Sequence, residues 1–173
     1  MKRVALALVI AFLVAGCLHA SPPGSDEETL AAHQLEGVFP TLEQLKVAGF
    51  RNQDWCQFID YPRGSFTNIL DPDSTCNLFD GRPQSFDGTA SADFQHVKEA
   101  LDNSGVGLFM VWNIEYDTNG QITTAEFEVT AGDFDRFSYL YDRDNTISKE
   151  PNPDTIVTDR INDDWWFMST DWN

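Results

Sequence analysis

Basic residues are scarce in this chain, as are histidine, cysteine and long apolar runs. The 173 residues include 11 Lys and Arg against 28 Asp and Glu, a formal net charge of −17. So few cations argue against binding nucleic acid or anionic lipid headgroups, because both need basic side chains. The excess of acid favours a cationic partner instead, although solubility or a saline habitat would explain the same composition.

Three histidines and three cysteines leave little material for catalysis or for transition-metal binding. His96 is the only histidine within the segment predicted to fold, and no Gly-x-Ser-x-Gly sequence provides a nucleophile. A zinc site would need more Cys or His ligands close together. The sequence therefore predicts no catalytic residues, no metal and no cofactor, and it favours a protein that is not an enzyme.

The one long apolar run, residues 4–14, is short for a membrane span. As a helix it would cover roughly 16 Å, against about 30 Å for a bilayer core. A transmembrane helix is therefore not expected. Lys2 and Arg3 precede the run and small residues follow it up to Cys17, which gives the basic start, apolar middle and cleavage site of a secretory signal.

Residues 14–17, Val-Ala-Gly-Cys, resemble the lipobox of bacterial lipoproteins, and this resemblance covers the signal alone. It implies that residues 1–16 are removed and that Cys17 becomes a lipidated N-terminus outside the cytoplasm, held stably by its acyl chains. Leu18 stands where an aspartate would imply retention in the inner membrane. The resemblance therefore implies the outer membrane, facing the periplasm, if the host is Gram-negative. An ordinary secretory signal with a chance cysteine is the alternative.

The mature chain is predicted to be a tether followed by one domain. Without the signal, nine of the 11 basic residues remain against all 28 acidic ones, a formal charge of −19. Residues 17–37 begin at the lipidated Cys17, are rich in Pro, Gly, Ser and acid, and predict a flexible tether. Residues 38–173 are long enough, and aromatic enough, to form a single globular domain with a real core.

Cys56 and Cys76 remain once Cys17 is assigned to the lipid. Outside the cytoplasm they are expected to pair as a structural disulfide. Closing a loop of about 20 residues would stabilise the fold by roughly 3 kcal/mol. The surrounding residues 51–90 are rich in Asp, Pro, Gly, Ser and Asn, so irregular loops and short strands stapled by this bond are expected there.

Two short helices are predicted from capping residues and apolar spacing. One begins near residue 39, with Thr41 and Gln44 as a capping box. The other covers about 91–103, with Ser91 as its cap and Gly105 as its stop.

Residues 106–116 and 122–130 form the clearest strand pair, because Asn119-Gly120 between them is a typical two-residue hairpin turn. A turn at those residues fixes the register and gives one apolar face with three expected pairs: Met110 with Val129, Trp112 with Phe127, and Ile114 with Ala125. The other face is expected to be solvated and acidic.

Two more strands, about 134–142 and 164–170, follow the hairpin. The predicted class is therefore α+β: two short helices and a disulfide-stapled loop region packed on an antiparallel four-stranded meander sheet.

Two surface features are candidates for binding a partner. Glu115, Glu126 and Glu128 share the solvated face of the hairpin and would form an acidic patch suited to a basic protein; a merely wet sheet face is the alternative. Trp172, beside the C-terminus, is the best candidate for an exposed ring. The C-terminal sequence 163–172 combines tryptophan with aspartate, as sugar-binding and sugar-cleaving sites do, unless those rings belong to the core.

Two acidic sequences, Asp71-Pro72-Asp73 and Asp142-Arg143-Asp144-Asn145, begin like calcium-binding loops. Neither continues with glycine at the sixth position and glutamate at the twelfth. Ordinary solvated turns are therefore expected at both places.

Together these features predict a lipid-anchored, extracytoplasmic, non-catalytic protein-binding module with a basic protein partner. Within that class we favour an immunity or inhibitor protein against a basic toxin or cell-wall hydrolase, by analogy with other small acidic proteins and not from a motif. One alternative is a structural or assembly lipoprotein of the cell envelope. Another is a glycan-binding or glycan-cleaving protein that uses the C-terminal Trp/Asp cluster.

Overall fold

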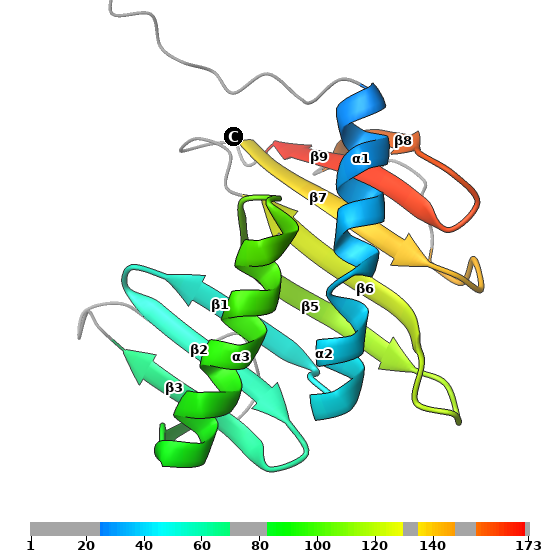
Figure 1. Cartoon of the computed structure of the whole chain (residues 1–173). Helices are drawn as coiled ribbons and strands as arrows, with labels where there is room; N and C mark the ends of the chain where they lie inside the picture. The colour runs from blue at the N-terminus through cyan, green and yellow to red at the C-terminus, as the bar shows by residue number, and fades with distance from the viewer. Residues whose placement is uncertain (1–24, 70–82, 130–134, 148–154, 172–173) are drawn as a thin grey trace, which may run out of the picture.

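The structure is a computed structural model that describes residues 25–69, 83–129, 135–147 and 155–171. In these residues a nine-stranded sheet carries helices on one of its faces (Figure 1). The helices are α1 (Ser25–Glu36), α2 (Phe39–Leu45) and α3 (Gly88–Ser104). The strands are β1 (Gly49–Gln53), β2 (Cys56–Tyr61), β3 (Gly64–Ile69), β4 (Gln84–Ser85), β5 (Leu108–Tyr116), β6 (Ile122–Val129), β7 (Asp135–Asp142), β8 (Thr155–Arg160) and β9 (Trp165–Asp171). The predicted α+β class is confirmed.

The strand order is β4-β3-β2-β1-β5-β6-β7-β9-β8. All neighbours are antiparallel except β3 and β4, which run parallel. A helix followed by a three-stranded meander occurs twice, as α2 with β1–β3 and as α3 with β5–β7, and the two meanders join where β1 pairs with β5. The predicted four-stranded meander is therefore wrong as a whole sheet, although its four strands lie side by side as β5, β6, β7 and β9.

Strands β1, β2 and β3 occupy much of the region in which irregular loops and short strands were predicted, and they are more regular than expected. Turn-forming residues such as Asp54 and Pro62 lie between these strands, while Phe50, Phe58 and Phe66 lie within them and are buried. Averaged over the segment, the many turn-forming residues suggested loops, because short strands and tight turns alternate within it. No disulfide joins two of the described residues, because Cys76 lies outside them, so the predicted Cys56–Cys76 bond stays a prediction.

The prediction of a flexible tether through residue 37 is wrong from Ser25 onward. Residues Ser25–Glu36 form α1, and Ala31, Ala32 and Leu35 on one side of it are buried. Acidic residues in its first turn also favour the helix, since they face the positive end of the helix dipole. The folded part therefore begins before residue 38, and Cys17 lies outside the described residues.

Both predicted helices exist, but they are capped differently. Helix α2 begins at Phe39 after Val38, which makes no side-chain cap, and Pro40 occupies its first turn. The Thr41–Gln44 capping box is therefore wrong. Helix α3 begins three residues earlier than predicted, because the Asp87 carboxylate, and not Ser91, accepts the Ala90 N–H at 2.7 Å. Gly105 ends α3 with φ 74°, as predicted.

The β5–β6 hairpin is confirmed, but its register is shifted. Glu115 pairs with Thr124, whereas Met110 lies opposite Glu128, and Trp112 lies opposite Glu126. The register changes at Asn113, which has φ 51°, within an irregular stretch of β5. The three apolar pairs expected from a two-residue turn are therefore wrong.

The turn also differs from the prediction, because it is longer than two residues. The Asp117 carboxylate accepts the N–H groups of Asn119 and Gln121, each at 2.9 Å, and the Asp117 N–H donates to the Gln121 carbonyl. An aspartate that binds its own turn's amides thus replaced the expected tight turn.

The core lies between the sheet and the helices. Phe94 of α3 stacks on Phe50 of β1 with ring centroids 4.8 Å apart. Phe39 of α2 contacts Phe127 of β6 and Trp165 of β9. Each helix therefore covers strands of the other meander, and these contacts hold the two halves together. None of the described helices is both long and apolar enough to cross a bilayer.

Candidate functional site

The sheet face turned away from the helices holds most of the polar side chains predicted to bind a partner. Since Phe50 and Phe127 contact the helices, alternation along each strand directs Arg51, Glu126 and Glu128 to the other face. We call this the opposite face. Along one row of it the strand register places Arg51, Met110, Glu128 and Ser138 side by side.

The structure brings Glu126 and Glu128 together, but not as a solvated patch. Glu128 is only 4% exposed, and Glu126 is partly buried between Trp112 and Leu140. Glu115 is exposed. The prediction that the three glutamates share an open, wet surface is therefore wrong for Glu126 and Glu128, because the shifted register places the large apolar side chains of Met110 and Trp112 beside them.

The environment of Glu126 favours its protonated form. Burial raises the pKa of the Glu126 carboxyl, and the neighbouring Glu128 adds to this effect. Hydrogen bonds from Ser138 and Asn113 act in the opposite direction, the latter with Nδ2 at 3.3 Å from Oε2. A carboxyl held in this way is suited to internal hydrogen bonding and poorly suited to attracting a distant basic protein.

The basic side chains that the structure describes are all engaged within the chain. Lys46 donates to the Gly120 carbonyl and lies over the Tyr116 ring, and Arg51 is buried against Trp55. The other four form ion pairs: Arg63 with Asp87 and Asp93, Lys98 with Asp102, Arg143 with Asp117 and Asp144, and Arg160 with Asp163. Each of these Lys and Arg side chains is thus held by contacts within the chain. The exposed side chains of the described surface include many carboxylates without such a cation beside them.

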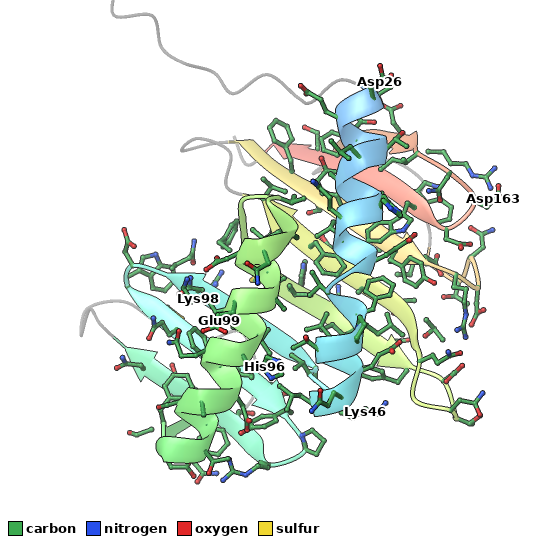
Figure 2. All side chains as sticks on the ribbon, viewed as in Figure 1. Asp26, Lys46, His96, Lys98, Glu99 and Asp163 are labelled. Atoms are coloured by element: carbon green, nitrogen blue, oxygen red, sulfur yellow. The ribbon has the colours of Figure 1, made fainter. Side chains whose placement is uncertain are left out.

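Carboxylates gather where the first turn of α1 meets the end of the sheet at β8 and β9. Burial raises the pKa of the Glu28 carboxyl, and the nearby Asp159 of β8 raises it further. Beneath them, burial with the charges of Glu28 and Glu27 raises the pKa of Tyr139 to about 12. We call Glu28 and Asp159 the acidic corner; Asp163, labelled at the β8–β9 turn in Figure 2, pairs instead with Arg160. This corner could not be predicted from the sequence, because Glu28 and Asp159 are 131 positions apart and β8 was not predicted.

The tryptophans of the C-terminal strand belong to the core. Trp165 is fully buried and its Nε1 donates to Glu36 of α1 at 3.3 Å, and Trp166 is 7% exposed. Neither ring offers a face on which a sugar could stack, so this part of the glycan hypothesis loses its support. Trp172 lies outside the described residues, and its predicted exposure stays a prediction.

The calcium-like sequence at residues 142–145 is a turn with its own hydrogen-bond donors. Asp142 is fully buried, and its carboxylate accepts the backbone N–H groups of Thr146 and Ile147, each at 2.9 Å. The second such sequence, 71–73, lies outside the described residues. Within the described ranges, no three His, Cys, Asp or Glu side chains converge as a metal site would require. His96 is exposed on α3 (Figure 2).

Comparison with known proteins assigns no family: no protein-family model matches the chain, and no curated protein or solved structure matches it.

Proposed function

We propose that this chain is a lipid-anchored extracytoplasmic protein that binds a basic protein partner and has no catalytic activity of its own. The observation that carries the proposal is that the described basic side chains are bound within the chain. Each one that the structure describes is engaged by the chain itself, while Asp26, Glu99 and Glu115 are among the acids that remain exposed.

Such a surface acts on partners at a distance. With a formal charge of −19 on the mature chain, it repels anions and accelerates encounter with cationic proteins. The enrichment of acid therefore serves association rate and partner choice, and the contact surface supplies the rest of the binding energy.

Within this class we favour an inhibitor or immunity role against a basic cell-wall hydrolase or toxin. The anchor inferred from residues 14–17 would place the protein where such enzymes act. Two tandem meanders bridged by helices form a broad, continuous sheet, a scaffold on which an inhibitory surface can be held rigidly. The envelope-assembly alternative has no described feature in its favour.

The partner class is tested with a basic hydrolase of known charge. The mature chain is titrated with egg-white lysozyme and with an acidic protein of similar size, at low and high salt, and binding is followed calorimetrically. We expect saturable binding to the basic protein that weakens as salt rises, and inhibition of cell-wall lysis. Equal affinity for the two proteins would overturn the proposal of a basic partner. Binding that leaves lysis unaffected would overturn the inhibitor role.

The anchor is tested separately in the native host. Wild-type protein and the Cys17→Ala variant are compared for incorporation of labelled palmitate and for sedimentation with membranes. We expect both signals in the wild type and neither in the variant. Membrane association that survives the substitution without label would show that Cys17 does not carry the anchor.

A further inference from the structure

The sheet ends at β8 with an edge that no described strand covers. Strand β8 pairs with β9 on one side, and the sheet order stops there. At the opposite end of the sheet the edge strand β4 has only two residues. A six-residue edge strand presents a row of unpaired backbone N–H and C=O groups, which can template the addition of another strand.

The direction of these backbone groups follows from the β8–β9 turn. The Ile161 N–H donates to the Trp165 carbonyl at 2.9 Å, so the backbone groups of Ile161 face β9. Because the direction alternates along a strand, those of Asp159 also face β9 while those of Thr158 and Arg160 point away from the sheet. An added strand would therefore bond to Thr158 and Arg160.

The charge around this edge selects what can add to it. Asp159 lies close enough to Glu28 for its charge to disfavour ionisation of the Glu28 carboxyl, and the neighbouring Arg160 is already bound to Asp163 at 2.8 Å. A second copy of this chain would bring the same acids to the same place, which opposes pairing between copies. An incoming strand that carries lysine or arginine would relieve the repulsion.

We propose that the outer edge of β8 takes up an extended, basic segment of the partner as an additional strand, with its cationic side chains against the acidic corner. This inference rests on the proposed function, since it names the surface at which the basic partner docks. Backbone hydrogen bonds to Thr158 and Arg160 supply affinity, and the carboxylates of Glu28 and Asp159 select positive charge.

The test uses a short fluorescein-labelled peptide of alternating lysine and threonine, whose binding to the mature chain is followed by anisotropy. One comparison peptide carries N-methyl groups on successive amides, so that neither of its edges can pair, and another has glutamate in place of lysine. Thr158→Pro removes the outward N–H, whereas Thr158→Ala keeps it. Glu28→Gln with Asp159→Asn neutralises the acidic corner, and Glu99→Gln with Asp54→Asn makes the same charge change elsewhere.

We expect Thr158→Pro to weaken peptide binding about five- to tenfold, as loss of one backbone hydrogen bond implies, with Thr158→Ala close to wild type. Neutralising the acidic corner should weaken binding at least as much at low salt, and more than the charge-matched control does. N-methylation should abolish binding to the wild-type protein, a result that does not depend on how any variant folds.

Three results would overturn the proposal. If the peptide still binds after N-methylation, and also binds the Thr158→Pro variant, the binding arises from surface charge and no strand is added. If lysozyme binds the wild type and Thr158→Pro equally, edge docking fails while the proposed function stands. A dimer in sedimentation that Thr158→Pro abolishes would assign the edge to a second copy of the chain.

Discussion

Replacing Asp142 tests whether its buried carboxylate is a structural acceptor or a cation ligand. One oxygen accepts the Thr146 N–H at 2.9 Å and its hydroxyl at 3.2 Å, and the other accepts the Ile147 N–H at 2.9 Å. In Asp142→Asn one oxygen becomes an NH₂ group, so one backbone N–H then faces a donor instead of an acceptor.

The cost follows from the hydrogen bonds lost. A hydrogen bond to a charged acceptor contributes about 1.5–3 kcal/mol, and leaving one donor without a partner costs about 1–3 kcal/mol. Because Thr146 is exposed and can turn to water, we expect Asp142→Asn to lower the free energy of unfolding by about 2 kcal/mol. Asp142→Ala, which removes both acceptors, should lower it by about 3 kcal/mol.

Urea unfolding monitored by circular dichroism measures this difference. With a slope of about 2 kcal/mol/M, the midpoint should fall by about 1 M for Asp142→Asn. The control is Asp144→Asn, because Asp144 is exposed and its ion pair with Arg143, at 3.4 Å, lies at the surface; its midpoint should stay near wild type. Equal midpoints for Asp142→Asn and wild type would refute the reasoning, and stabilisation of the wild type by added calcium would assign Asp142 to a cation instead.

Three further predictions concern the hairpin and its neighbours. Tyr116→Phe should destabilise the protein by about 1 kcal/mol in the same urea assay, because the hydroxyl donates to the Val47 carbonyl at 2.6 Å. Gly120→Ala should cost about 1 kcal/mol or more, since Gly120 has φ 81° and the new methyl group would meet the Lys46 side chain; an unchanged midpoint would contradict the left-handed turn. Glu126→Gln should flatten the loss of stability as pH rises above about 4.5, because a carboxyl whose folded pKa is raised stabilises the fold only while protonated; an identical pH profile in the variant would show that Glu126 is not buried.

Much of the secondary structure was determined locally. The apolar spacing of α3 and the glycine at its end lie within the helix's own sequence. Helix α3 and its end at Gly105 could therefore be predicted. Strands β5, β6, β7 and β9 were likewise evident from long aromatic and β-branched stretches. Helix α1 was missed because its first residues are acidic and polar, and it is stabilised by burying Ala32 and Leu35 against other elements.

The candidate site was less predictable, because it depends on register and on distant contacts. A two-residue turn at Asn119-Gly120 was locally plausible, yet the Asp117 carboxylate and the left-handed Asn113 shift the pairing. A shift of one position decides which side chains are buried, since neighbouring residues of a strand face opposite sides. Here the shift turns Met110 of β5 to the face of Glu128 and places it opposite that residue, and Glu128, expected in solvent, is buried.

The sequence by itself determined the α+β class and the acidic composition, because these depend on residue types and short spacings, and the N-terminal pattern from which we propose an anchor at Cys17 is likewise local. Only the tertiary structure decided that internal ion pairs consume the described cations, that Trp165 and Trp166 are core, and that Glu28 meets Asp159 beside an open strand edge. These are long-range relations fixed by packing, and no local pattern in the chain encodes which distant residue becomes a neighbour.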